Sequence, residues 1–195
     1  MDVVQIYKPA QKAFQRRIAE CGNSGGKTAT MPLIISIIGR SGSGKTTLIE
    51  KLIRHFSVRG HKIATIKHMR HEFDIDRPGK DTWRYREAGA HAVIITNDRD
   101  FALMSRNDSA LESEALAEKY FSEYDLVIIE GEKEGSAPKI EVIGDSHEPP
   151  LFRSGTLDVA AVVTDSPLSA GVPVFVRNDA EGVASFIETL LGLPK

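Results

Sequence analysis

Two kinds of hydrophobic pattern follow one another along the chain from about Met31. Short, almost wholly apolar runs such as LIISII at 33–38 predict strands that are buried on both faces, because they have no alternating polar side. Between them, apolar residues spaced three and four apart, as in the segment from Lys45 towards Gly60, predict helices with one buried face. The other expected strands are 61–66, 92–96, 101–105, 126–130, 139–143, 159–164 and 172–176, and the other expected helices are 82–88, 110–120 and 180–191.

Alternation of such strands with helices predicts an α/β fold, with a mostly parallel sheet and helices on both faces. Ligands of these sheets bind at the carboxyl ends of the strands. The region from Pro138 to Gly155 breaks the alternation, because it contains Pro149-Pro150 and has little helical periodicity. We expect an extra β excursion there, directed towards a partner.

The tripeptide Gly-Lys-Thr occurs twice, eighteen residues apart. A phosphate-binding loop requires the spacing G-x-x-x-x-G-K-[ST] between a strand and a helix, because its backbone N–H groups must surround an anion. The copy at 39–46 has this spacing, whereas the copy at 26–28 has Cys21 in place of the first glycine and is interpreted as a linker. The predicted nucleotide-binding residues of this loop are Gly39, Arg40, Ser41, Gly42, Ser43, Gly44, Lys45, Thr46 and Thr47.

A second polar group is expected beside this loop. The run DLVIIEG places Glu130 at the tip of a buried strand, where it would bind Mg²⁺ together with the Thr46 hydroxyl, or orient water. The alternative is an acid that ends a strand in solvent. Another polar segment, 67–84, directly follows the second predicted strand, 61–66, and we interpret its Lys67, Asp76, Arg77 and Lys80 as phosphate and Mg²⁺ contacts rather than as parts of a histidine-rich metal site. Lys45, Glu130 and Asp76 are the predicted catalytic residues, and Thr46, Glu130 and Asp76 are the predicted metal ligands.

Composition narrows the class of protein. The formal net charge of −2 and the absence of a long apolar run do not suggest nucleic-acid binding or a membrane protein. A single cysteine, Cys21, excludes intrachain disulfides and thiolate zinc sites, so we expect the cytoplasm. Residues 1–30 carry five basic and two acidic side chains, a net +3, and are expected to be a poorly ordered basic extension of a P-loop domain at 31–195.

Three motifs together resemble the MobB family, the GTP-binding adaptors of molybdopterin-guanine dinucleotide biosynthesis. They are GRSGSGKTTLIEKLI, IKHMRHEFDIDRPGKDTWRYREAGA and DLVIIEGEK. The resemblance implies a P-loop fold, GTP with Mg²⁺, weak hydrolysis, a homodimer, and partnership with the guanylyltransferase and the molybdenum-insertion enzyme. Glu132 departs from it, because the family tends to have an aromatic residue there, and we expect a changed surface contact.

Arg40 occupies a loop position from which some dimeric P-loop proteins reach the partner's phosphate with a lysine. It would act as an arginine finger, or it would lie solvated over its own loop.

Guanine selection requires a carboxylate that accepts hydrogen bonds from N1–H and from the 2-amino group. Asp165 follows the predicted strand AAVVT and meets this requirement, and Asp179 is the second choice, although it also suits the N-cap of the last helix. A different class of function is an ATP-dependent small-molecule kinase or ligase, since similar P-loop folds resemble dethiobiotin synthetase.

Overall fold

The structure, a computed structural model, describes residues 31–73, 75–145 and 148–194, so the predicted extension at 1–30 and its Gly-Lys-Thr copy lie outside the described residues. The described residues form two compact units. One contains the residues up to His68 and from Glu112 onward, and the other is Met69–Leu111. We call the first the sheet unit and the second the hairpin unit.

The sheet unit is built on a six-stranded sheet whose strands all run parallel, in the order β2-β5-β1-β6-β7-β8. Its elements are β1 (Leu33–Ile38), α2 (Lys45–Val58), β2 (Ile63–Lys67), α4 (Ser113–Tyr120), β5 (Leu126–Glu130), β6 (Lys139–Val142), the 3-10 helix η2 (Leu151–Ser154), β7 (Ala161–Val163), β8 (Val174–Phe175) and α5 (Ala180–Leu191).

Register places the predicted polar groups at one edge of this sheet. Glu130, the last residue of β5, is level with Ile37 of β1 on one side and with Lys67 of β2 on the other. Because parallel strands bring their carboxyl ends to the same edge, the segments that follow β1, β2 and β5 begin side by side. The prediction of a parallel sheet with a polar carboxyl edge is confirmed.

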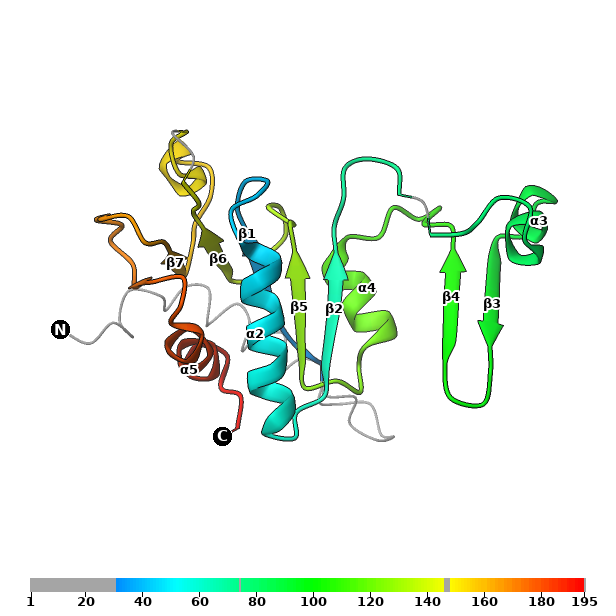
Figure 1. Ribbon diagram of the computed structural model, residues 1–195, viewed down its shortest axis with the longest axis horizontal. Helices are drawn as coiled ribbons and strands as arrows, with labels where there is room; N and C mark the ends of the chain where they lie inside the picture. Colours follow the sequence, from blue (N-terminus) through cyan, green and yellow to red (C-terminus); the bar gives the residue numbers. More distant parts are fainter. Residues whose placement is uncertain (1–30, 74, 146–147, 195) are drawn as a thin grey trace. The chain divides into compact units, whose positions relative to one another are not determined.

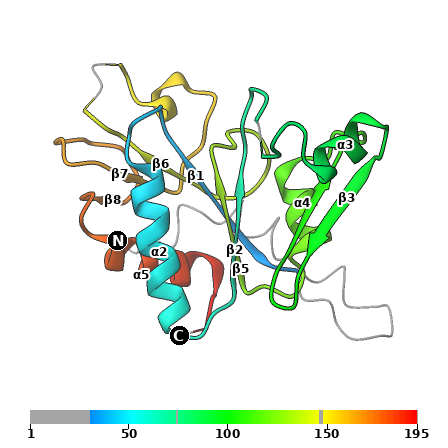
Figure 2. The same ribbon diagram turned by 45° about the vertical axis from the view of Figure 1, so that its right-hand side comes forward.

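Helices cover both faces of the sheet, as predicted (Figures 1 and 2). Alternate residues of β1 point to opposite sides. Ile35 and Ile37 pack in a core cluster with residues of α2 and α5, whereas Ile34 packs in a second cluster that includes Ala117 of α4. Phe56 of α2 is fully buried in the first cluster.

The interruption after β6 is organised by a buried acid. Glu141 is only 2% exposed, and its carboxylate accepts the backbone N–H of Leu151 at 2.7 Å and that of Phe152 at 2.9 Å. The first turn of η2 is therefore tied to the central sheet. Residues 138–155, where we expected an extra β excursion, thus contain β6, which is a strand of the main sheet, followed by a loop with a 3-10 turn.

We expect Glu141→Gln to lower the free energy of unfolding by about 1–2 kcal/mol, because an amide offers one acceptor oxygen where two backbone donors are now bound by a charged group. Urea denaturation measures this change. Glu181→Gln, in the exposed first turn of α5, is the matched control. An unfolding midpoint equal to wild type in Glu141→Gln would show that the loop does not depend on this carboxylate.

One predicted helix starts later than its hydrophobic pattern suggests. We expected 110–120, but α4 begins at Ser113. The amide of Asn107 accepts the N–H of Leu111 at 2.9 Å and donates to its carbonyl at 3.0 Å, and Ala110 has a φ of 47°. A left-handed residue cannot continue an α-helix, so this local turn displaces the helix start.

The hairpin unit contains α3 (Asp81–Glu87) and the antiparallel strands β3 (Ala92–Thr96) and β4 (Phe101–Ser105). The side chain of Asn97 closes the turn by accepting the N–H groups of Arg99 and Asp100 at 2.8 Å. All ten residues of the two strands are described, and only Val93 is buried. Apolar side chains are therefore left in solvent, including Ile94, Ile95 and Phe101, which are 60%, 55% and 73% exposed.

Candidate nucleotide-binding site

The predicted phosphate loop joins β1 to the start of α2. Gly42 and Gly44 have φ angles of 72° and 98°, in the region that only glycine enters without strain. Gly39 is required for a second reason, since a Cβ atom built there would lie 2.3 Å from the carbonyl oxygen of Val142 in β6. The loop is thus packed against the neighbouring strand, and it leads into the N-terminus of α2, where unpaired N–H groups favour an anion.

Lys45 reaches back over this loop. Its Nζ donates to the carbonyl oxygen of Arg40 at 2.7 Å. Burial lowers the pKa of Lys45; the charge of Glu130 acts in the opposite direction, and the charges of Lys67 and Lys133 lower the pKa further. The charges of two further lysines, one at the end of β2 and one after β5, therefore act on the ammonium group of Lys45. Sequence reasoning predicted Lys45 and Lys67 but missed Lys133, although Lys133 stands only three residues after Glu130 in the same loop.

Thr46 and Glu130 are brought together as the pattern predicted. The Thr46 hydroxyl donates to Glu130 Oε1 at 3.3 Å. Mg²⁺ takes oxygen ligands and keeps several waters or phosphate oxygens, so a hydroxyl beside a single carboxylate fits it. No group of three or more His, Cys, Asp or Glu side chains within the described ranges could hold a metal ion by itself, so these two oxygens would need phosphate or water oxygens to complete a coordination shell.

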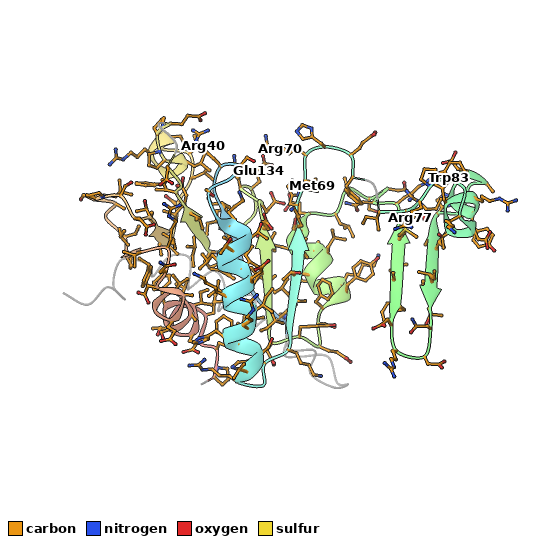
Figure 3. All side chains as sticks on the ribbon, in the orientation of Figure 1. Arg40, Met69, Arg70, Arg77, Trp83 and Glu134 are labelled. Atoms are coloured by element: carbon orange, nitrogen blue, oxygen red, sulfur yellow. The ribbon has the colours of Figure 1, made fainter. Side chains whose placement is uncertain are left out.

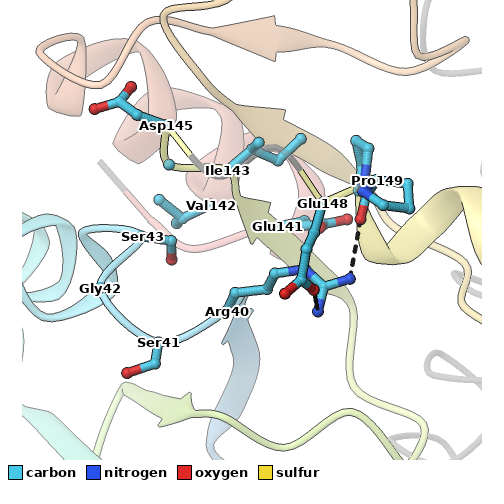
Figure 4. Close-up of a pocket in the computed structure, with 12 residues that line it drawn as sticks. Arg40, Ser41, Gly42, Ser43, Glu141, Val142, Ile143, Asp145, Glu148 and Pro149 are labelled. Carbon is cyan, nitrogen blue, oxygen red and sulfur yellow. Dashed lines mark hydrogen bonds and ion pairs between the residues drawn. The ribbon is translucent and has the colours of Figure 1, made fainter.

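Arg40 lines a pocket that the loop forms with the segment after β6 (Figure 4). One guanidinium nitrogen forms an ion pair with Glu148, and another donates to the carbonyl oxygen of Pro149 at 3.2 Å. The side chain is therefore held within its own chain, and it connects the phosphate loop to the loop that Glu141 ties down.

Glu132 is buried, which corrects the expectation of a surface contact. It is 8% exposed, and its Oε2 accepts the Ser113 hydroxyl at 2.9 Å and lies 3.2 Å from Nδ1 of His68. The backbone N–H of His68 donates to the carbonyl oxygen of Glu130 at 2.9 Å. Glu132 thus links α4 to the residue that follows β2, directly beside Lys67 and Glu130.

Asp165 and Asp179, the two candidates for reading guanine, have different surroundings. Asp165 is half exposed, and both its carboxylate oxygens accept hydrogen bonds from Arg177. Those bonds, the backbone one first and then the side-chain one, lower the pKa of Asp165. Asp179 is the N-cap of α5 and accepts the N–H of Gly182 at 2.9 Å, so the capping interpretation of Asp179 is confirmed.

Asp76 belongs to the hairpin unit, and its contacts are local. Its Oδ1 accepts the N–H of Arg77 at 3.0 Å and the hydroxyl of Thr82 at 2.9 Å. Its Oδ2 is buried without a hydrogen-bond partner among the described residues. Figure 3 labels the neighbouring Arg77 and Trp83, of which Trp83 lies in α3. The catalytic and metal-binding roles of Asp76 stay predictions.

Within the described part of the chain, every helix is too short or too polar to cross a membrane.

Comparison with known proteins agrees with the geometry of the site. Residues 34–165 match the family described as molybdopterin guanine dinucleotide synthesis protein B, or MobB. The chain is 37% identical over 159 residues to the molybdopterin-guanine dinucleotide biosynthesis adapter protein of Haemophilus influenzae, a match that covers 81% of this chain and 89% of that protein. It is 36% identical to the protein of the same name from Escherichia coli, with 81% and 93% covered.

Solved structures are similar in the same way. A crystal structure of molybdopterin-guanine biosynthesis protein B superposes with a TM-score of 0.67 at 31% identity and covers 82% of this chain and 99% of that one. Bacillus subtilis MobB gives a TM-score of 0.64 at 25% identity, with 84% and 98% covered. In this chain the phosphate loop lies between a buried strand and a helix, beside the contact of Thr46 with Glu130 at the end of β5. The chain belongs to the MobB family.

Proposed function

We propose that the protein is a GTP-binding adaptor with weak GTPase activity that assists the guanylyltransferase step of molybdopterin-guanine dinucleotide biosynthesis. Membership of the MobB family and the names of its relatives support the pathway and the adaptor role. The observation that carries nucleotide binding is the contact of Thr46 with Glu130 directly beside Lys45 at the carboxyl edge of the sheet.

Each residue of this site has a separate task. The backbone N–H groups of the loop and the start of α2 bind the phosphates, and Lys45 exchanges its contact with the Arg40 carbonyl for phosphate oxygens. Lys67 and Lys133 add positive charge at the same edge. Thr46 and Glu130 would hold Mg²⁺, which when bound neutralises charge on the phosphates, and Glu130 also orients water near the terminal phosphate.

We also propose that the chain works as a homodimer together with the guanylyltransferase and the molybdenum-insertion enzyme. The hairpin unit supports this, because Ile94, Ile95 and Phe101 would be shielded from water by a protein surface. A two-stranded sheet by itself is marginally stable in water, so a second copy of the hairpin is a favourable partner.

Turnover of the isolated protein tests the proposed function. An adaptor should release phosphate from GTP at well below about one turnover per minute, since an unassisted GTPase turns over at about 0.02–0.03 per minute. Malachite-green detection of phosphate from the full chain with GTP and Mg²⁺ measures this rate. Rapid stoichiometric transfer of the terminal phosphate from ATP to a small molecule would overturn the adaptor and favour a kinase.

Arg40→Ala is expected to leave this hydrolysis rate within about twofold of wild type, because Arg40 is bound to Glu148 and Pro149 of its own chain. The assay must use protein concentrations at which the chain sediments as a dimer. A fall in the hydrolysis rate of about a thousandfold is expected if Arg40 is an arginine finger. That result would show that Arg40 contacts the phosphate bound by the partner subunit.

A further inference from the structure

Three loops at the carboxyl edge of the sheet meet in one charged network. Asp145 follows β6, Asp165 follows β7 and Arg177 follows β8. Nη2 of Arg177 lies 2.7 Å from Oδ1 of Asp145, and Nε of Arg177 donates to Oδ2 of Asp165 at 2.7 Å. Asp145 also lines the pocket beside the phosphate loop, together with Ser41, Gly42 and Ser43. One arginine therefore links the pocket wall to the predicted base-reading carboxylate.

The geometry at Asp165 leaves no oxygen unbound. The backbone N–H of Arg177 donates to Oδ1 at 2.9 Å, while Nε takes Oδ2. Guanine would use the same two oxygens, one for N1–H and one for the 2-amino group. A carboxylate oxygen has two lone pairs, so the backbone N–H, which is a single fixed donor, can remain and orient Asp165. The guanidinium is a bulkier donor on a flexible side chain, and its Nε–H takes up Oδ2, the oxygen that the second donor of guanine would use.

We propose that Arg177 is a specificity-determining residue of the base site, which guanine must displace from Asp165. This inference rests on the proposed function, since it assumes that Asp165 reads guanine. Asp145 makes the exchange inexpensive, because the guanidinium keeps that partner when it leaves Asp165. Adenine has no matching pair of donors and gains nothing from the displacement. Arg177 therefore weakens GTP binding by competing with guanine for Asp165. Asp145 reduces this competition, because it offers Arg177 another partner.

Two substitutions should act in opposite directions. Arg177→Ala removes the competing side chain and keeps the backbone N–H, so the affinity for GTP should rise about two- to fivefold, the range of a partly exposed ion pair, while the affinity for ATP stays unchanged. Asp145→Ala removes the alternative partner, so Arg177 should stay on Asp165 and the affinity for GTP should fall by about the same factor.

Calorimetric titration of the full chain with GTP and with ATP, both with Mg²⁺, measures the ratio of the two affinities. Arg54→Ala is the matched control, because that arginine lies on α2 and, among the described residues, forms an ion pair only with Glu50, at 3.7 Å. Arg177→Lys should act in the same direction as Arg177→Ala, since a lysine has one charged nitrogen in place of the two that now bind Asp165 and Asp145, and it replaces Arg177→Ala if that variant unfolds.

The two proposals fail differently. If wild type prefers GTP, and Asp165→Ala removes the preference, but the ratio is unchanged or falls in Arg177→Ala, the displacement is wrong and base reading by Asp165 stands. The same conclusion follows if Asp145→Ala raises the ratio or leaves it unchanged. If wild type binds GTP and ATP equally, base reading itself is wrong, and the role of Arg177 is overturned with it.

Discussion

Lys45→Ala is expected to abolish tight nucleotide binding while the fold stays intact. The ammonium group of Lys45 already lies inside the loop, 2.7 Å from the Arg40 carbonyl oxygen. Lys45 is partly buried, which lowers its pKa, and a phosphate in the loop would match its charge. A hydrogen bond to a charged group contributes about 1.5–3 kcal/mol, so affinity should fall at least about tenfold and up to about a hundredfold from this contact alone.

Lys51→Ala is the matched control. Lys51 lies on the same helix, but its Nζ donates to Asn178 Oδ1 at 3.3 Å, away from the loop. Titration calorimetry with GTP and Mg²⁺ should give wild-type affinity for Lys51→Ala and an affinity at least about tenfold weaker for Lys45→Ala. Both variants should unfold at the wild-type temperature. Normal affinity in Lys45→Ala would remove the phosphate site from this loop.

Asp165→Ala is expected to lower the preference for GTP over ATP by about ten- to a hundredfold, because guanine would lose the carboxylate that accepts hydrogen bonds from both its N1–H and its 2-amino group. Binding of the triphosphate tail should be preserved, since the phosphate loop is untouched. Competition between GTP and ATP for a fluorescent nucleotide measures the preference directly.

Asp179→Ala separates base reading from helix capping. The carboxylate of Asp179 caps α5 through Gly182, so its loss should cost about 1 kcal/mol of stability and leave the preference for GTP unchanged. If Asp165→Ala instead keeps full preference and Asp179→Ala loses it, the base site belongs to the loop after β8. If neither variant changes the preference, backbone carbonyls read the base.

The carboxyl edge of the sheet could be predicted from sequence because its parts are short and contiguous. The spacing of glycine, lysine and threonine in residues 39–46 by itself predicts a phosphate-binding loop. The apolar run that ends at Glu130 predicts a buried strand with this acid at its tip. The order of the strands could not be predicted, since register depends on pairing between distant segments. The contact of Thr46 with Glu130 was therefore expected. The position of β5 between β1 and β2, which places Glu130 level with Ile37 and Lys67, was not.

Contacts between distant segments were missed. Asp165 was predicted, but its partner Arg177 and the second partner of Arg177, Asp145, were not, because the three lie in separate loops and no local pattern links them. Glu141 lies within the buried strand β6, where an acid is unfavourable unless backbone donors reach it, and those donors come ten and eleven residues later. Glu132 is a third example, because its buried contacts come from α4 and from the end of β2.

The most direct test of the central proposal is the affinity of the full chain for the purified guanylyltransferase in three states: without nucleotide, with GTP and Mg²⁺, and with GDP and Mg²⁺. Surface plasmon resonance with Lys45→Ala as the nucleotide-free control measures it. An adaptor governed by GTP should bind the guanylyltransferase with an affinity that differs between the GTP state and the other two, and Lys45→Ala should bind equally in all three. Equal affinity of the wild-type chain in the three states would contradict the account.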